Sequence, residues 1–286
     1  MDTARTTDIL TGQTATKQPT NYGALGTLVT VFFFWGFIAA SNSIFIPFCK
    51  HFFHLDQFQS QLIDFAFYGA YYIGALLLYL ISVSRGKDVM AQWGYKKGII
   101  YGLLLSVLGA VAMIISVNYS GFSAILTSLF IVALGFSLQQ TGAQPFAIAL
   151  GDPSTGSHRV NLGGGVNSFG TMIGPIVVTL ALFGSTTVTD EQIASLNLDK
   201  VTILYICVGA LFMIAALLFI FSKKLPAGTS DADIEKSRKA TLTMIIITVI
   251  LVGLFIPVFD SYKTVPANDE EKHVHRGEPL PGSSQP

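Results

Sequence analysis

Two amide side chains stand four residues apart in an otherwise apolar stretch of this sequence: Gln140 and Gln144, with Pro145 directly after them. Residues four apart lie on the same face of a helix, and a proline inside a helix removes one backbone hydrogen bond and bends it. Asn167 and Thr171 repeat the spacing in the next apolar stretch. Because amides both donate and accept hydrogen bonds, these residues indicate a binding site for an uncharged, hydroxyl-rich ligand such as a sugar.

Polar groups also enter two earlier apolar stretches, where Asn42 and Ser43 lie in the first and Asp64 in the second. A carboxylate placed in the membrane is costly and usually functional, so Asp64 is a candidate for carrying a proton. The alternative is that Asp64 lies in a water-filled outer vestibule or pairs with a neighbouring helix. For the Ser, Asn and Gln residues the alternative is structural, since such side chains also hold membrane helices together at about 0.6 kcal/mol per hydrogen bond.

Helices that cross a membrane are needed to position these residues. Charged residues make up 12% of the 286-residue chain, about half of the ~25% that is typical of soluble domains. A helix needs about 20 mostly apolar residues to cross a bilayer, whereas barrel strands would alternate over about ten residues. Seven segments meet the helical requirement: 25–48, 58–84, 99–117, 122–150, 160–184, 201–222 and 241–259.

Four local patterns add detail. Asp56 followed by Gln59 has the spacing of a capping box and predicts that the second helix begins there. The stretch 85–93 is too short to span and predicts a short amphipathic helix on the cytoplasmic surface. The glycine run 163–165 lacks the strand and the Lys-Ser/Thr of a phosphate loop, so it indicates close helix packing or flexibility. Trp35 is interpreted as a lipid-facing or packing residue, with stacking on a sugar ring as the alternative.

The basic residues orient the chain. Ten Lys and Arg residues lie in the loops after the second, fourth and sixth segments, whereas the alternate loops carry Lys50 and Lys200. Cytoplasmic loops are enriched in Lys and Arg. The N-terminus is therefore expected in the cytoplasm, and the polar tail after the seventh segment on the opposite side of the membrane.

Other classes of function find no support in the residues. The net charge of zero provides no basic face for a nucleic-acid partner. Cys49 and Cys207 lie in or beside apolar segments without the spacing of metal ligands, and all five histidines lie in loops or the tail. The sequence therefore predicts neither an intramembrane enzyme nor a metal or cofactor site.

Five motifs follow one another along residues 25–222: Phe33-Phe34-Trp35-Gly36 leading to Asn42 and Pro47, Phe67-Tyr68-Gly69-Ala70-Tyr71, Gly94-Tyr95-Lys96-Lys97-Gly98, Gln140-Thr141-Gly142-Ala143-Gln144-Pro145-Phe146, and Asn161-Leu162 with Asn167-Ser168-Phe169-Gly170. Together they resemble the fucose permease and glucose/galactose transporter branch (the fucose:proton symporter family) of the major facilitator superfamily. The resemblance implies an all-α transmembrane fold. It consists of the N-terminal six-helix half of a major facilitator fold plus one additional transmembrane helix.

The resemblance also implies a function. It implies secondary active import of a monosaccharide of the fucose, galactose or glucose class by alternating access, coupled to a proton or another cation, in the inner membrane of a bacterium. It further implies that the four amides face the cavity, and we place Ser43 and Thr171 beside them. The implied cavity amides are Asn42, Gln140, Gln144 and Asn167.

Two departures from the family concern ion coupling. Fucose permeases carry an acid where this chain has Ser43 and a second acid where it has Gln140. A neutral amide cannot take up and release a proton near neutral pH. Coupling is therefore expected to have moved to Asp64 or to use another ion.

A third departure is that the family has a second six-helix half. The chain is therefore expected to be the N-terminal part of a longer transporter, with the missing C-terminal half or a second copy of itself as partner in the bilayer. The alternative is a non-transporting truncated half or an accessory membrane subunit. The expected divisions are a disordered cytoplasmic tail (1–24), the six-helix half (25–222), a cytoplasmic linker (223–240), the additional transmembrane helix (241–259) and a disordered extracytoplasmic tail (260–286).

Overall fold

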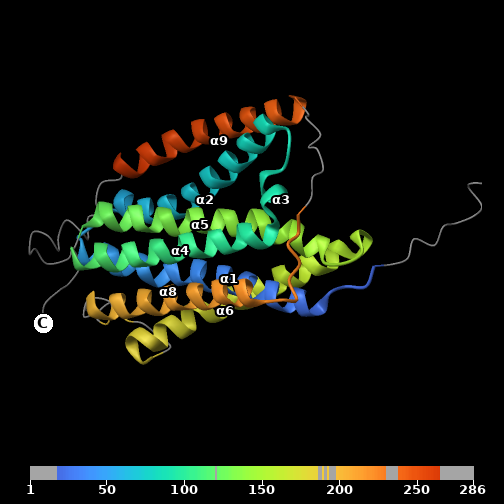
Figure 1. The fold of residues 1–286 in the computed structure, drawn as a ribbon. Helices are drawn as coiled ribbons and strands as arrows, with labels where there is room; N and C mark the ends of the chain where they lie inside the picture. Colours follow the sequence, from blue (N-terminus) through green and yellow to red (C-terminus); the bar gives the residue numbers. More distant parts are fainter. Residues whose placement is uncertain are drawn as a thin grey trace, which may run out of the picture.

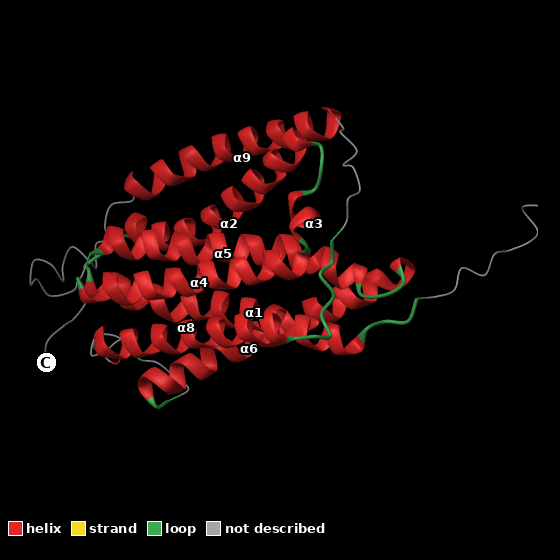
Figure 2. Cartoon of the chain, viewed as in Figure 1, coloured by secondary structure: helices red, strands yellow, loops and turns green. Residues whose placement is uncertain are grey.

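The computed structural model describes residues 18–119, 121–185, 189, 192, 198–229 and 238–264. The predicted disordered tails and much of the predicted linker lie outside these ranges. The described residues form helices joined by loops, with no strand among them (Figure 2). The helices are α1 (Tyr22–Phe52), α2 (Gln57–Arg85), α3 (Val89–Trp93), α4 (Tyr95–Asn118), α5 (Phe122–Ala149), the 3-10 turn η1 (Pro153–Thr155), α6 (Gly156–Phe183), α8 (Leu198–Phe221) and α9 (Arg238–Thr264).

Six of the described helices are long and apolar enough to cross a membrane, namely α1, α2, α4, α5, α6 and α8. They match the first six predicted segments, so the predicted six-helix unit is confirmed. The seventh segment also forms a helix, α9, whose described apolar stretch, Thr241–Leu254, is shorter than the six spans. That α9 crosses the membrane stays a prediction.

Local chemistry sets the ends of α2. The backbone N–H of Gln59 donates to the Asp56 carboxylate at 2.7 Å, and the Asp56 N–H donates to the Gln59 side chain at 3.0 Å. The predicted capping box is therefore confirmed. At the other end, Gly86 has a φ of 73°, a left-handed conformation that glycine adopts without steric cost.

The short helix predicted over 85–93 is present as α3, which covers Val89–Trp93. Three of its five residues are buried. The helix therefore packs against the bundle, and only part of it is available to a membrane surface.

The helices pack in neighbouring pairs (Figure 1): α1 lies along α6, α5 packs against both α2 and α4, and α8 covers α4. Glycines permit the closest approaches between α1 and α6. A Cβ at Gly36 would overlap the backbone of Asn167, and a Cβ at Gly170 would overlap the carbonyl of Phe33. Small residues let helices approach backbone to backbone, which is how membrane helices gain packing energy.

The glycine run 163–165 divides between two roles. Gly163 is buried against the ring of Phe32, as close packing requires. Gly164 and Gly165 are exposed, with open space where a Cβ would stand. Close helix packing therefore explains the first glycine of the run and not the other two.

Helices α2 and α8 end, and α4 and α6 begin, at one end of the bundle (Figure 1). Basic residues stand at or beside these helix ends, so we call it the basic end: Arg85, Lys96, Arg159 and Lys224. There the segment after α8, residues 222–229, crosses the start of α4. The N–H groups of Tyr95 and Lys96 donate to carbonyls of this segment at 3.3 Å, and the Lys96 ammonium donates to the Ser222 carbonyl at 2.8 Å. The first N–H groups of a helix have no partner within it, so the 222–229 segment caps α4.

Arg159 caps another helix, α5, at the basic end. Its side chain is 4% exposed. The guanidinium donates to the carbonyls of Ala147 and Ile148 at 2.7 Å and of Asp152 at 2.8 Å. The last carbonyls of a helix lack intrahelical donors, so Arg159 satisfies the end of α5 and ties it to the start of α6. In the sequence, Arg159 is one of the ten Lys and Arg residues of the predicted cytoplasmic loops, and its capping role does not follow from that position.

Candidate functional site

The two amides of α5 lie one turn apart and have no protein partner. Gln140 is half-buried and Gln144 is exposed. Within the part of the chain that the structure describes, neither side chain makes a hydrogen bond to another residue. The predicted shared face is present, because α5 continues as a helix through Pro145 to Ala149. These amides are therefore available to a ligand.

The matching pair on α6 behaves differently. Asn167 is half-buried, and its amide makes no hydrogen bond to a described residue. The Thr171 hydroxyl donates to the Asn167 carbonyl at 3.1 Å, and it lies against Gly36 of α1. Thr171 therefore has its donor satisfied within α6, which leaves Asn167 as the unpaired group of the two.

Contacts with α1 indicate which of these residues lie at the same position along the axis of the bundle. Trp35 donates its indole N–H to Gln139, the neighbour of Gln140, at 3.1 Å. The next residue, Gly36, contacts Asn167. Gln140 of α5 and Asn167 of α6 are therefore at the same level, on the two helices that pack with α1. Their meeting in one sugar cavity stays a prediction.

Asn42 and Ser43 lie farther along the same helix. Asn42 is six residues beyond Gly36 in α1, which is about 9 Å at the rise of an α-helix. It lies beyond that level on the side away from the basic end, and Gln144 lies on the basic side. The side chains of residues 41–44 are outside the described part of the structure. Their predicted place in the cavity stays a prediction.

Asp64 is not beside the amides. Helix α2 runs parallel to α5, because Gly74 contacts Ser137 and the Phe67 ring meets the Phe136 ring edge to face. By these pairings Asp64 lies level with about residues 127–133 of α5, or roughly 10–20 Å along the axis from Gln140. The carboxylate is half-buried and makes no hydrogen bond or ion pair with a described residue. Any coupling between Asp64 and the amides must act across that distance.

Sequence reasoning missed the role of Gln139. This side chain is fully buried; it accepts from Trp35 and donates to the Ser106 hydroxyl at 3.0 Å. Ser106 in turn donates to the carbonyl of Val132 at 3.2 Å. The network joins α1, α5 and α4. Trp35 is 8% exposed, so of the two predicted roles, lipid-facing or packing, the packing role is the one that the structure supports.

The comparisons with known proteins agree with this geometry. Over 211 residues the chain is 33% identical to the glucose/galactose transporter of Brucella abortus (strain 9-941), which covers 73% of this chain and 48% of the relative. Over 216 residues it is 32% identical to the L-fucose-proton symporter of Escherichia coli (strain K12), which covers 71% and 47%. No family model matches the chain.

Solved structures show the same relation. The fucose:proton symporter of E. coli superposes with a TM-score of 0.59 at 27% identity, over 79% of this chain and 56% of that one. A major facilitator transporter in the outward conformation gives 0.58 at 30% identity, over 77% and 55%. The chain belongs to the fucose permease and glucose/galactose transporter branch of the major facilitator superfamily.

This family consists of membrane transporters, so the prediction that the chain is no enzyme is confirmed. The predicted family and all-α transmembrane fold are confirmed too. The chain spans about half the length of the curated relatives it matches. The six candidate spans among its described residues lie in a unit that superposes on 56% of the solved fucose:proton symporter.

Proposed function

We propose that this chain forms the N-terminal half of a secondary active transporter that imports a monosaccharide of the fucose, galactose or glucose class. The observation that carries the proposal is the level shared by Gln140 and Asn167, whose amides have no partner among the described residues. An unpaired amide in a membrane bundle is costly unless water or a ligand satisfies it. Sugar hydroxyls match its donors and acceptors.

In this proposal Gln140 and Asn167 hold the sugar, and Gln144 extends the site toward the basic end. Asn42 and Ser43 extend it toward the opposite end, and Thr171 shapes the wall beside Gly36. Titratable groups are absent from the six positions, which suits an uncharged substrate. The relatives' names, glucose/galactose transporter and L-fucose-proton symporter, agree with this substrate class.

A second six-helix unit completes the cavity, supplied by a C-terminal half or by a second copy of this chain. The two units rock about the sugar and expose it to each side of the membrane in turn. The Lys- and Arg-rich basic end faces the cytoplasm, as the distribution of basic loops indicates. The N-terminus then lies inside and the C-terminal end of α9 outside.

Uptake is coupled to a proton or another cation, and Asp64 is the candidate group. Support comes from its half-buried position in α2 and from the relation to a proton symporter. Uptake driven by an inward proton gradient is expected to fall to the gradient-free rate in Asp64→Asn, with sugar binding retained. Unchanged gradient-driven uptake in this variant would remove Asp64 from the mechanism.

The test is binding and uptake of labelled fucose, galactose and glucose by the chain in lipid vesicles, with and without a pH gradient. Gln140→Ala is compared with Gln92→Ala, a matched change at an exposed position of α3. We expect sugar binding in the wild type and in Gln92→Ala, and its loss in Gln140→Ala. Uptake by the chain alone would identify a second copy as the partner, and binding without uptake would identify a C-terminal half. Absence of binding to any of the three sugars would favour a non-transporting accessory subunit.

A further inference from the structure

Helix α9 is attached to α2 by two pairs of hydroxyl groups. The Tyr72 and Thr248 hydroxyls form a hydrogen bond of 2.5 Å, and those of Tyr79 and Thr241 form one of 3.0 Å. The pairs are seven residues apart on both helices and run in opposite order, so the helices are antiparallel. Figure 1 shows α9 on the outer side of α2, away from the other helices.

The two hydroxyl pairs set the register between α2 and α9, and this register also assigns partners to residues outside the pairs. Positions spaced alternately by three and four residues form one stripe along a helix. On α9 the stripe is Thr241, Met244, Thr248 and Leu251. The first three are partly covered, whereas the residues between them are exposed. Coverage stops at Leu251, which is 52% exposed.

The α2 side of the stripe continues in the same way. Tyr79 and Tyr72 are followed toward the start of α2 by Gly69, Phe65 and Leu62 at alternating spacings of three and four. The register pairs Gly69 with Leu251, just as it pairs Tyr72 with Thr248. The same register therefore continues to pair residues of α2 with residues of α9 beyond Thr248, where the two helices are no longer in contact.

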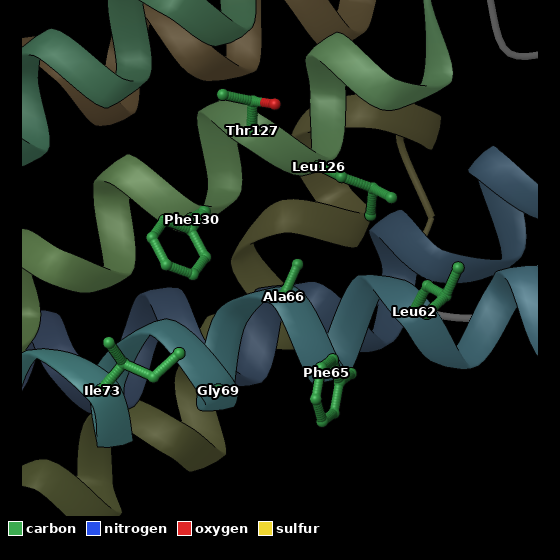
Figure 3. Close-up of a pocket in the computed structure, with 8 residues that line it drawn as sticks. All are labelled: Leu62, Phe65, Ala66, Gly69, Ile73, Leu126, Thr127 and Phe130. Carbon is green, nitrogen blue, oxygen red and sulfur yellow. The ribbon is translucent and has the colours of Figure 1, made fainter. Parts of the chain in front are cut away.

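An open groove begins at that point. It has a volume of about 350 Å³ and lies between α2 and α5 (Figure 3). Leu126 and Phe130 point from α5 toward α2, and Ala66 points from α2 toward α5. The lining is apolar apart from one hydroxyl; it consists of Leu62, Phe65, Ala66, Gly69, Ile73, Leu126, Thr127 and Phe130.

We propose that this groove is the docking site for the turns of α9 that follow Thr248. Leu62, Phe65 and Gly69 belong both to the groove and to the stripe, so the groove is continuous with the existing interface. The α9 side chains that would enter it are apolar and exposed, with Leu251 at 52% and Leu254 at 61%. Docking buries these residues against α2 and α5, and the hydroxyl pairs act as the fixed point.

Disulfide cross-linking in lipid vesicles tests the proposal, using the full chain with Cys49 and Cys207 replaced by Ala. The test pair is Gly69→Cys with Leu251→Cys; a Cβ at Gly69 meets only the Phe65 ring, at 3.8 Å and beyond. The reference pair is Tyr72→Cys with Thr248→Cys. The control pair is Gly69→Cys with Gly253→Cys, because Gly253 has open space around it and lies on the opposite face of α9.

A protease site inserted after Glu235 lets a non-reducing gel separate cross-linked from free α9. We expect the test pair to form an intramolecular disulfide within about threefold of the rate of the reference pair, and at least tenfold faster than the control pair. A test pair no faster than the control, while the reference pair forms, would overturn the proposal. A disulfide between two chains would also overturn it and would assign the groove to a second copy.

Filling the groove gives an independent check. Ala66→Leu and Ala66→Trp place larger side chains in the space that α9 would occupy. They are expected to slow the test pair severalfold and leave the reference pair unchanged. If the test pair keeps its rate in variants whose melting temperature is unchanged, the occupant of the groove is something other than α9.

Discussion

Gln139 and Gln140 are identical and adjacent, yet they belong to two different regions of the bundle. Gln139 faces the seam where α1, α4 and α5 meet, where it is fully buried and bonded to Trp35 and Ser106. Gln140 is half-buried and has no partner among the described residues. One step along the helix therefore separates a buried, hydrogen-bonded amide from the amide that we propose binds the sugar.

The difference shows how the bundle holds polar side chains without losing rigidity. Polar atoms in the seam satisfy one another, so they specify a single arrangement of the helices. In the proposed function, the amides of Gln140 and Asn167 have no protein partner, so their hydrogen bonds to a sugar contribute to binding. Substitutions in the seam and at these amides should therefore separate loss of stability from loss of binding.

The largest effect is expected where backbones touch. Gly36→Ala places a methyl group against the backbone of Asn167, so α1 and α6 must move apart. Overpacking of this kind costs about 3 kcal/mol or more, or roughly 5–15 °C in melting temperature. Thermal melting in detergent measures it. Gly164→Ala, which meets nothing within 4 Å, is the control, and an equal loss there would contradict the assignment.

The next effect belongs to the seam. Gln139→Ala leaves the Trp35 N–H buried without an acceptor, at a cost of about 2–3 kcal/mol. The melting temperature should fall well below that of Gln140→Ala, which removes the same atoms one residue away. Equal melting temperatures for the two variants would mean that the network contributes nothing to stability.

Substitutions of the proposed sugar-binding amides should reduce binding and leave stability unchanged. Gln140→Ala and Asn167→Ala are each expected to weaken sugar binding at least tenfold, which corresponds to about 1.4 kcal/mol. Their melting temperatures without sugar should stay within about 2 °C of wild type. Equilibrium binding of labelled sugar gives the affinity. Wild-type affinity in both variants would place the site elsewhere.

The smallest effect on stability is expected for a buried polar group that has no described partner. The Ser137 hydroxyl is buried beside Gly74 and has no hydrogen-bond partner among the described residues. Ser137→Ala should therefore change stability by no more than about 0.5 kcal/mol. Ser106→Ala removes the partner of Gln139 and should cost about 1 kcal/mol. If Ser137→Ala costs more than Ser106→Ala in thermal melts, the hydroxyl has a partner that we have not identified.

The helices could be predicted from sequence because the bilayer leaves few alternatives. In lipid every backbone group must be bonded within its own segment or in a closed barrel, so the seven apolar stretches of sufficient length predict helices, and the structure forms a helix at each of them. The capping box at Asp56 was predictable for a similar reason, since its partners are three residues apart. Both are local consequences of chain chemistry.

The roles of Gln139, Trp35 and Arg159 were not predictable in this way. Each depends on a partner between 11 and 104 residues distant, and the spacing of polar residues does not tell which face of α5 meets α1. Gln140 and Asn167 could be singled out because each begins a pair of polar residues four apart in an apolar segment. The pattern gave their chemistry, and the contacts of Gly36 and Trp35 gave their common depth.

The 222–229 segment also determines when the bundle can be completed. It supplies the acceptors for the N–H groups of Tyr95 and Lys96, and Gly228 follows Tyr95 by 133 residues. At about 5–20 residues per second, a ribosome needs roughly 7–27 s to make that stretch. During this interval α4 is inserted with its first turn uncapped. The basic end is therefore the last part of the six-helix unit to close during synthesis.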